Sequence, residues 1–575
     1  MKTLLKDLKP HRKEVVLAPL FKMLEAVFEL FVPLVMKSIM DVGIPSGDRG
    51  SVLRSALLLV LLAFVGLASA VTAQYFSAKA ATGFAGTLRK KLFRRIQTMS
   101  FSALDEHGAS TLITRMTSDV NQVQNGVNLT LRLFLRSPFI VFGALIMAFV
   151  VDPKRAWIFA VVIPLLLAIV FFILLIALPR YKKVQSSLDT VTRSTRENLS
   201  GVRVIRAFIL EDSETEKFIE RNRVLRSLQT GVGRISAFLN PVTYVIINLG
   251  LVAILYFSGL ANSTEGTVIA LVNYMSQILV ELVKLANLLI QMTRAAASLS
   301  RISEVLSPAP DDENEVMLTD APENGSSLET DTAVRFDHVS MAYRNAGENA
   351  LTDVTFTAKK GETIGIIGGT GSGKSTLVSV LSGLYPIDEG NVEIDGIPIG
   401  DYDRRTLRNK IGFVMQHSVL FRGTVRDNLL MGDPDADDET LVKALRDAQA
   451  FDFVMEKEGG PDAEVTEGGV NFSGGQRQRL QIARALVRRP EILILDDASS
   501  ALDFQTDAAL RETIRNDKGL RTVFIISART ASVMHADRIL VMEEGRVVSE
   551  GTHRELLDSS EVYREIYESQ YGEIK

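Results

Sequence analysis

The chain has 575 residues, a formal net charge of −4 and no cysteine. A chain of this length is too long for one hydrophobic core, so two or more domains are expected. The slightly acidic balance argues against a nucleic-acid ligand, and the lack of cysteine excludes disulfides, thiolate chemistry and cysteine-ligated metals.

The N-terminus is basic and precedes a long apolar run. Its cationic residues are Lys2, Lys6, Lys9, Arg12 and Lys13. A basic start can belong to a signal peptide, but no small-residue cleavage site follows, and the apolar run leads into further spans. We therefore expect an uncleaved cytoplasmic segment.

Six apolar segments reach the ~20 residues that a helix needs to cross a bilayer. They lie at 15–40, 53–78, 128–151, 156–179, 238–262 and 265–292. A buried helix of a soluble protein is shorter and is seldom apolar on every face. The sequence therefore predicts six spans in a lipid bilayer.

The connections between these spans differ in charge. Segment 79–127 holds seven Lys and Arg residues and segment 180–235 holds twelve, whereas the short connections hold only Arg49, Lys154 and Arg155. By the positive-inside rule, the two long connections and both termini are cytoplasmic. Their composition favours helices that extend out of the membrane, with turns near 102–108 and 201–208.

Two groups of charged residues lie within the predicted spans. Lys22, Glu25 and Glu29 share one face of the first span, and Glu281 and Lys284 form an i, i+3 pair in the last. Intramembrane charges usually face a bundle interior or a wet cavity. Because opposite charges on adjacent turns can satisfy each other, we favour cavity lining or a structural pair over a substrate ligand.

Composition also predicts the domain boundaries. Residues 306–332 are acidic, poor in aromatics and interrupted by proline and glycine, which is typical of a linker. The sequence thus predicts a transmembrane domain at 1–305, a linker at 306–332 and a soluble α/β domain at 333–575.

The soluble domain contains a glycine-rich loop after the apolar strand 363–367. The loop is Gly368, Gly369, Thr370, Gly371, Ser372, Gly373, Lys374, Ser375 and Thr376, which fits G-x-x-x-x-G-K-[ST]. In such a loop, backbone N–H groups surround phosphate oxygens at a helix N-terminus, the lysine reaches the β- and γ-phosphates, and the serine hydroxyl binds Mg²⁺. We therefore expect ATP and Mg²⁺ as cofactors.

Four further features accompany this loop. Tyr343 lies 31 residues before Lys374, where its ring can stack on adenine. Gln416 follows the apolar strand 411–415. The glycines of the run 471–480 open a helix and so form a second anion site. The apolar strand 492–495 ends in Asp496, whose carboxylate is placed to hold Mg²⁺.

In this order the motifs resemble those of ATP-binding-cassette (ABC) transporters, specifically the bacterial exporter-type half-transporters with six spans before one cassette. The resemblance covers nearly the whole chain, and its most specific motif is Ser473, Gly474, Gly475 and Gln476. It implies an all-α six-helix transmembrane domain with long cytoplasmic helical extensions, followed by an α/β P-loop cassette. It also implies an ABC-type transport ATPase in the bacterial plasma (inner) membrane.

The resemblance assigns roles to individual positions. It makes Tyr343 the adenine-stacking aromatic, Gln416 the sensor of Mg²⁺ and γ-phosphate, and 471–476 the signature. Segment 500–503, which ends in Asp503, resembles the D-loop. The turns near 102–108 and 201–208 resemble coupling helices, and 465–469 matches the loop that contacts them. Two cassettes of this family pair head to tail, so the P-loop of one faces the signature of the other.

Two positions depart from the family pattern. Hydrolysing cassettes carry Glu after the Mg²⁺ aspartate, where this chain has Asp497, and His in the switch loop, where it has Ala528. The shorter carboxylate is displaced by roughly 1.5 Å, and a shift of that size can cost ~100-fold in rate. Seven residues along a helix span roughly 10 Å, so His535 cannot easily replace the missing donor.

The signature differs only in Phe472, where Leu is usual. An intact signature beside altered catalytic positions resembles the degenerate-site subunits of bacterial heterodimeric multidrug exporters. We therefore expect a second, different half-transporter as partner, and amphipathic or hydrophobic compounds or drugs as substrates, with hydrolysis mainly at the composite site. A lipid or peptide exporter, an importer on the exporter fold, and an ATP-gated channel-like or regulatory subunit remain as alternatives.

Overall fold

A computed structural model describes residues 6–260, 264–307, 331–344, 346–416, 419–498, 500–516 and 521–572. The chain forms two compact units. One contains residues up to Gln97 together with Ser110–Ser307, and the other contains Thr98–Ala109 together with the chain after Pro308. Most of the predicted linker, 306–332, lies outside the described residues, so the predicted domain boundaries stay a prediction.

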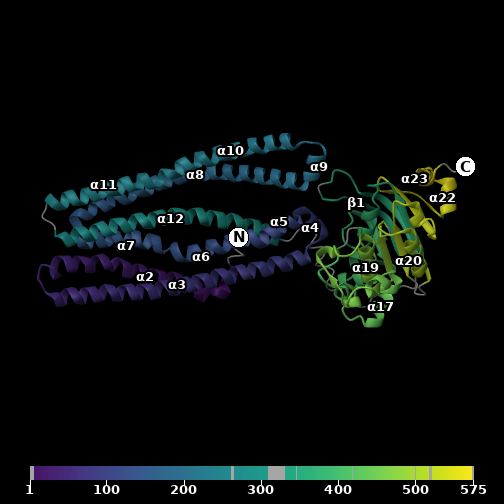
Figure 1. Cartoon of the computed structure of the whole chain (residues 1–575), viewed down its shortest axis with the longest axis horizontal. Coiled ribbons are helices and arrows are strands. Elements are labelled where there is room, and N and C mark those ends of the chain that lie inside the picture. The colour runs from purple at the N-terminus through teal and green to yellow at the C-terminus, as the bar shows by residue number, and fades with distance from the viewer. Residues whose placement is uncertain are drawn as a thin grey trace. The chain divides into compact units, whose positions relative to one another are not determined.

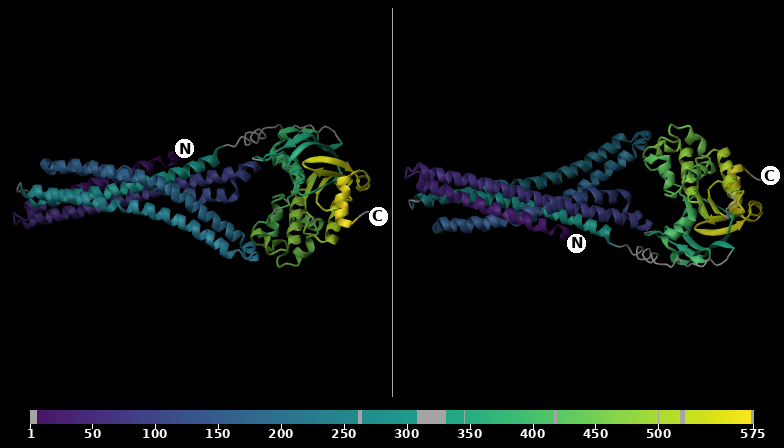
Figure 2. Two further views of the ribbon diagram at one scale, coloured as in Figure 1. Left: turned by 90° about the horizontal axis from the view of Figure 1, so that it is seen from above. Right: turned by 90° about the horizontal axis from the view of Figure 1, so that it is seen from below.

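The first unit consists of helices (Figures 1 and 2). Its long helices are α2 (Arg12–Ser38), α3 (Arg49–Thr98), α6 (Val120–Leu133), α7 (Arg136–Val151), α8 (Pro153–Ser200), α10 (Glu211–Ala237), α11 (Leu239–Leu260) and α12 (Glu265–Leu306). Its short helices are η1 (Lys6–His11), η2 (Ile39–Gly43), α5 (Ala109–Thr114), η3 (Arg115–Asp119) and α9 (Val202–Ala207).

Several of these helices are longer than a bilayer is thick. Helix α3 has 50 residues and α8 has 48, so at ~1.5 Å per residue each is roughly 70 Å long. The hydrocarbon core of a bilayer is only ~30 Å thick. The predicted continuation of the spans as extended helices is therefore confirmed.

Five helical stretches in the described residues are long and apolar enough to cross a membrane. They are Arg49–Thr98, Ala109–Val151, Pro153–Ser200, Glu211–Gly259 and Glu265–Leu306. Four of them contain a predicted span, and Glu211–Gly259 covers residues 238–259 of the span predicted at 238–262. The sixth prediction, 15–40, falls mainly on α2, which has 27 residues but carries Lys22, Glu25 and Glu29 in its apolar part. Length alone allows α2 to span a bilayer, and these three charges lower its hydropathy.

Helix α12 lies at the centre of this unit, where it packs against α2, α6, α7, α8 and α11. Tyr274 of α12 is fully buried and donates a hydrogen bond of 2.7 Å to the carbonyl of Leu30 in α2. At Gly126 of α6, a Cβ would lie 2.2 Å from the Cβ of Ala295 in α12. Small residues at that crossing therefore let the two helices approach closely.

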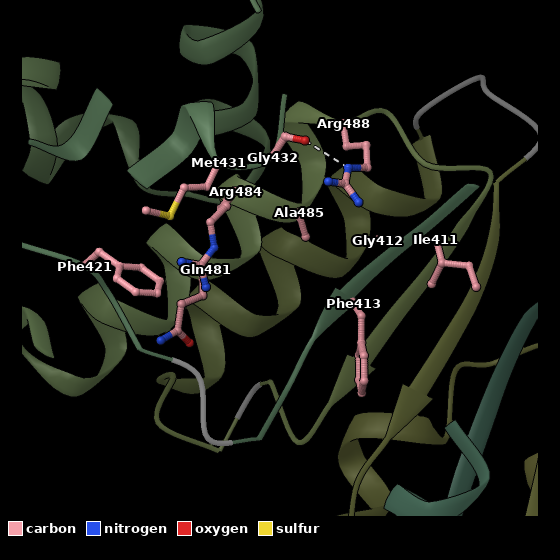
Figure 3. Close-up of a pocket in the computed structure, with 10 residues that line it drawn as sticks. All are labelled: Ile411, Gly412, Phe413, Phe421, Met431, Gly432, Gln481, Arg484, Ala485 and Arg488. Atoms are coloured by element: carbon pink, nitrogen blue, oxygen red, sulfur yellow. Dashed lines mark hydrogen bonds between the residues drawn. The ribbon is translucent and has the colours of Figure 1, made fainter. Parts of the chain in front are cut away.

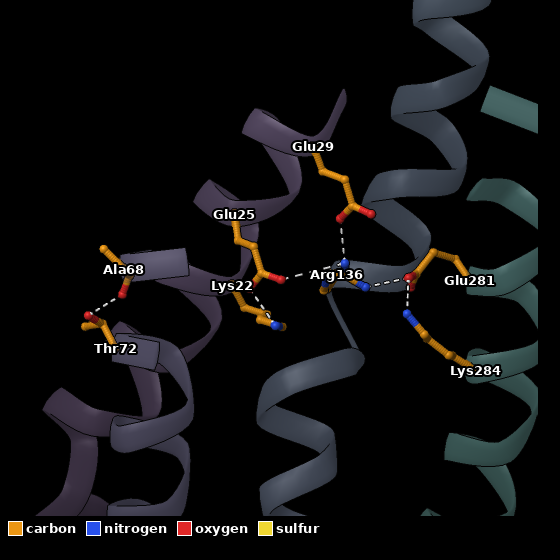
Figure 4. A network of polar contacts seen from close by, with 8 residues as sticks. All are labelled: Lys22, Glu25, Glu29, Ala68, Thr72, Arg136, Glu281 and Lys284. Atoms are coloured by element: carbon orange, nitrogen blue, oxygen red, sulfur yellow. Dashed lines mark hydrogen bonds and ion pairs between the residues drawn. The ribbon is translucent and has the colours of Figure 1, made fainter. Parts of the chain in front are cut away.

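One guanidinium connects three helices inside this bundle (Figure 4). Arg136, at the start of α7, is 6% exposed and donates to Glu281 of α12 at 2.5 Å and to Glu29 of α2 at 2.6 Å. Glu25 of α2 lies 3.8 Å from the same guanidinium. Glu29 and Glu281 were predicted to find opposite charges within their own helices. In the structure they share a cation from a third helix, α7.

The predicted pairs within each helix are also present. Lys22 contacts Glu25 at 2.5 Å, and Lys284 contacts Glu281 at 2.9 Å. With Arg136 and Glu29, the cluster holds three cations and three carboxylates, so its formal charges cancel. A neutral, hydrogen-bonded cluster is the form in which charges are tolerated inside a membrane protein.

The cassette in the second unit contains two main sheets and a small third one. The four-stranded sheet has the order β2-β1-β4-β5, and the six-stranded sheet has the order β12-β11-β3-β10-β9-β6. Their strands are β1 (Thr332–Met341), β2 (Leu351–Lys359), β3 (Thr363–Gly368), β4 (Glu389–Ile394), β5 (Ile397–Pro398), β6 (Ile411–Val414), β9 (Ile492–Asp496), β10 (Thr522–Ile526), β11 (Arg538–Glu543) and β12 (Arg546–Gly551). The third pairs β7 (Gly423–Thr424) with β8 (Glu464–Val465).

Helices cover these sheets and form a separate helical layer. They are α14 (Lys374–Leu381), α15 (Arg404–Lys410), α16 (Val425–Leu430), α17 (Asp438–Asp447), α18 (Phe451–Met455), α19 (Gly474–Val487), α20 (Phe504–Asn516), α21 (Thr530–Val533), α22 (His553–Ser559) and α23 (Glu561–Tyr571), with short η5 (Ile399–Asp401), η6 (Gly460–Asp462) and η7 (Glu467–Gly469). The second unit also includes α4 (Phe101–His107). One hydrophobic core joins both main sheets, and a second lies under α16, α17, α18 and α19. The predicted α/β cassette is confirmed.

Candidate nucleotide site

The predicted site residues meet at one edge of the six-stranded sheet. Strands β3, β10, β9 and β6 are parallel neighbours. The P-loop follows β3, Ala528 follows β10, Asp496 ends β9, and Gln416 follows β6. Because carboxyl ends of parallel strands share an edge, four segments distant in sequence come together where ligands of open α/β sheets bind.

The P-loop has the backbone of a phosphate cradle. Gly371 and Gly373 adopt φ values of +83° and +94°, and a Cβ at Gly373 would lie 2.7 Å from the carbonyl oxygen of Ala350. Glycine is required at such a position. The next residue, Lys374, begins α14, so the loop ends at a helix N-terminus that favours anions.

Lys374 is folded back over its own loop. Its ammonium donates to the carbonyls of Gly368 at 3.0 Å and Gly369 at 2.6 Å. Burial lowers the pKa of this ammonium, while the carboxylates of Asp496 and Asp497 act in the opposite direction. A phosphate is a stronger acceptor than a carbonyl for this partly desolvated cation, so the loop fits the nucleotide that its sequence predicts.

The two oxygen groups predicted to hold Mg²⁺ are adjacent. The Ser375 hydroxyl donates to the Asp496 carboxylate at 3.2 Å, and Asp496 is buried. No group of three or more His, Cys, Asp or Glu residues that could cage a metal occurs in the part of the chain that the structure describes. Mg²⁺ commonly uses one or two protein oxygens together with substrate phosphates, so this pair fits such an ion.

Tyr343 lies beside the helix that follows the P-loop. Its hydroxyl is 3.1 Å from the Thr376 hydroxyl, and its ring packs edge-on against Tyr385 with 5.1 Å between centroids. These contacts hold the ring at the side of the phosphate cradle. That placement fits the predicted stacking on adenine.

The two altered positions flank the cradle. Asp497 is half-buried, has a φ of +49°, and donates its backbone N–H to the carbonyl of Ile526 at 2.9 Å. Ala528 follows the next strand, β10, and its methyl group offers no hydrogen-bond donor. His535 lies beyond α21, where its carbonyl accepts from Arg515.

Gln416 and Asp503 have different settings. Gln416 is exposed directly after β6, at the same sheet edge as Asp496. The Asp503 carboxylate accepts the backbone N–H of Thr506 at 3.0 Å, and hydrogen bonds from Thr506 lower the pKa of that carboxyl. In this chain Asp503 thus caps the start of α20, in addition to the role that was predicted for it.

The signature begins helix α19. Ser473 is its N-cap and forms a capping box with Gln476, in which each side chain accepts the other's backbone N–H at 3.3 and 3.0 Å. Ser473 and Gly474 are exposed, so the helix N-terminus is presented at the cassette surface. Phe472 is buried against Phe453, with Lys457 over its ring, which explains how an aromatic replaces the usual Leu.

A cavity of about 300 Å³ lies between β6 and α19 (Figure 3). Its lining is partly apolar and partly basic: Ile411, Gly412, Phe413, Phe421, Met431, Gly432, Gln481, Arg484, Ala485 and Arg488. Phe421 and Met431 are 56% and 46% exposed. The cavity therefore offers a contact surface of mixed apolar and basic character beside β6.

Sequence reasoning missed three polar residues that the fold places at important contacts. Arg136 was one of two arginines, with Arg132, inside the predicted span 128–151, which was the available signal. Gln478 bonds to the backbone at Asp497 and Ala501. Gln570 of α23 bonds to the backbone at Ala528 and Thr530. The contacts of the two glutamines depend on tertiary packing and have no local sequence pattern.

Comparison with known proteins decides the family. The ABC transporter transmembrane region matches residues 15–282, and the ABC transporter cassette matches residues 351–500. An uncharacterised ABC transporter ATP-binding protein of Bacillus subtilis, YfiB, is 35% identical over 100% of this chain and 99% of its own length. This chain belongs to the ABC transporter family.

Two further similarities describe this ABC transporter more closely. A Bacillus subtilis protein named for multidrug export, the ATP-binding/permease protein YgaD, is 31% identical over 100% of this chain and 98% of its own length. The structure of a bacterial Atm1-family ABC exporter with ATP bound has a TM-score of 0.80 and 22% identity, and the match covers 98% of this chain and 99% of that one. The latter likeness shows the fold. The chain is thus a membrane-embedded half-transporter with an ATP-binding, ATPase-type cassette.

Proposed function

We propose that this half-transporter is one subunit of a heterodimeric exporter, and that its own P-loop forms the ATP site that hydrolyses poorly. The observation that carries the proposal is the contrast within one cassette. The cradle, Lys374 and the Ser375–Asp496 pair are intact, whereas Asp497 and Ala528 stand at the positions that polarise water and bond the γ-phosphate. The site is built to bind nucleotide and lacks the groups that complete hydrolysis.

Residues of this chain then serve two different sites. At its own site, the P-loop N–H groups and Lys374 hold phosphates, Tyr343 stacks on the base, and Ser375, Gln416 and Asp496 hold Mg²⁺, which when bound neutralises phosphate charge. At the other site, Ser473, Gly475 and the N-terminus of α19 donate toward nucleotide held by the partner. The partner supplies the Glu and His that this chain lacks.

The substrates we propose are amphipathic or hydrophobic compounds, including drugs. Support comes from the apolar bundle, from its neutral charge cluster around Arg136, and from YgaD, whose name states multidrug export. We further propose a plasma membrane location with cytoplasmic termini, as the basic connections predict. We also propose that the cavity between β6 and α19 receives a coupling helix of the partner subunit.

The test is ATP hydrolysis by purified protein in lipid vesicles. This chain alone should bind ATP and hydrolyse it ~100-fold more slowly than the complex with its partner, because each homodimeric site would lack both catalytic groups. A second half-transporter encoded in an adjacent gene would be the first partner to co-express. Rapid hydrolysis by the chain alone, abolished by Lys374→Ala so that contaminants are excluded, would overturn the proposal.

A further inference from the structure

One side chain joins the signature helix to the segment after the Mg²⁺ aspartate. Gln478 lies on α19, two residues beyond the signature. Its side-chain N–H group donates to the carbonyl of Asp497 at 3.0 Å, and its side-chain oxygen accepts the backbone N–H of Ala501 at 3.1 Å. Both polar atoms of the amide are therefore used on the short loop 497–501, of which the structure describes Asp497, Ala498, Ser500 and Ala501.

The same loop also packs directly against the signature. A Cβ at Gly475 would lie 2.9 Å from the Ala501 carbonyl oxygen and 3.7 Å from a methyl group of Leu502. The Asp497 carbonyl also accepts the backbone N–H of Ser500 at 3.2 Å. Asp497, Ser500 and Ala501 are thus bonded to one another or packed against the start of α19.

These two elements belong to different ATP sites under the proposed function, on which this inference rests. Asp497 lies at the site built on this chain's P-loop, whereas Ser473 and Gly475 serve the partner's P-loop. We propose that Gln478 is a positioning residue that transmits ATP occupancy at the degenerate site to the signature that completes the competent one. It touches neither nucleotide and acts through the backbone of loop 497–501.

The two hydrogen bonds of Gln478 can transmit movement from Asp497 to helix α19, beyond holding the loop in place. A displacement of Asp497 toward nucleotide must either carry Gln478 and α19 along or break these hydrogen bonds, of which the one to the Asp497 carbonyl is partly buried and the one from Ala501 is exposed. Breaking them leaves polar groups unpaired, which is costly. The movements of the loop and of the signature helix are therefore energetically coupled. Such coupling is required if the two ATP sites are to influence each other.

The first experiment is a double-mutant cycle on the purified heterodimer, measured as steady-state ATPase activity. Lys374→Ala empties the degenerate site, and in the otherwise unchanged complex it should lower turnover at the competent site by at least about fivefold. In a Gln478→Ala background, the same Lys374→Ala change should have less than a twofold effect. Gln505→Ala, at an exposed glutamine of α20, is the matched control and should preserve the full response.

Gln478→Glu separates the two hydrogen bonds. It keeps an acceptor for the Ala501 N–H but loses the donor to the Asp497 carbonyl, so it should uncouple the sites as Gln478→Ala does. If Lys374→Ala acts equally in all backgrounds, or has no effect in the unchanged complex, the inference is overturned.

A second measurement does not depend on the partner. Hydrogen exchange of the Ala501 amide in the purified chain should become faster in Gln478→Ala and stay unchanged in Gln505→Ala, and unaltered protection in Gln478→Ala would overturn the inference. A different result would contradict the proposed function, namely a heterodimer whose ATP turnover is unchanged by Ser473→Ala. The two failures are thus distinguishable.

Discussion

At the scale of single residues, the cassette combines a P-loop that fits a nucleotide with Asp497 and Ala528 at the two positions that we propose to be altered catalytic ones. Lys374, Ser375 and Asp496 keep the contacts of a phosphate and Mg²⁺ site. Asp497 follows β9 and Ala528 follows β10, and these are the two positions predicted to be catalytic. Asp497 has a shorter carboxylate side chain than the usual Glu, and Ala528 has only a methyl group where His is usual. Binding and hydrolysis rest on different side chains, so one can persist when the other is weakened.

Arg136 carries a prediction about stability. Removing this guanidinium takes a buried cation away from Glu281, which keeps Lys284, and from the partly exposed Glu29. Leaving a buried charge with no partner typically costs roughly 3–5 kcal/mol, which is the upper limit for this change. Arg136→Ala should therefore lower the thermal unfolding temperature of the detergent-solubilised protein. Arg223→Ala is the control, because Arg223 pairs with Glu220 at an exposed surface site with 71% and 61% of the side chains accessible, where such pairs contribute little. Equal shifts for the two variants would contradict the account.

At the scale of elements, the start of α19 is constrained by loop 497–501. A Cβ at Gly475 would meet the Ala501 carbonyl at 2.9 Å, whereas at Gly474 the nearest such atom lies at an ordinary 3.7 Å. Gly475→Ala must therefore shift the backbone of the helix or the loop, and we expect ~10-fold or greater loss of heterodimer ATPase activity. Gly474→Ala should cause a smaller loss of ATPase activity. A larger loss for Gly474→Ala would show that the packing against Ala501 is unimportant.

The elements were predictable to different degrees. The P-loop, the strand ending in Asp496 and the signature have fixed local patterns, because each must place backbone groups around a phosphate. The long helices followed from apolar runs and from the scarcity of breakers. The first span was predicted from length, and only the fold shows that its charges are neutralised by Arg136 from another helix. Gln478 was not predictable, because its partners lie about twenty residues away in sequence and are backbone atoms.

At the scale of the whole molecule, the membrane orientation is open to a direct test. The chain has no cysteine, so one introduced thiol is unique. Ser46 is exposed in the short connection after α2, and Ser213 is exposed on α10 in the long basic connection. A membrane-impermeant maleimide applied to intact cells should label Ser46→Cys and leave Ser213→Cys unmodified until the cells are opened. Labelling of Ser213→Cys in intact cells would reverse the proposed topology.

The central claim is that this chain contributes a working signature and a poorly working catalytic site. Steady-state ATP hydrolysis by the purified heterodimer, compared between Ser473→Ala and Asp497→Asn, tests it most directly, with nucleotide binding measured separately. Removal of one donor from a transition-state site typically costs ~100-fold or more, so Ser473→Ala should reduce turnover far more than Asp497→Asn does. If Asp497→Asn abolishes turnover while Ser473→Ala leaves it near wild type, this chain carries the competent site and the account is wrong.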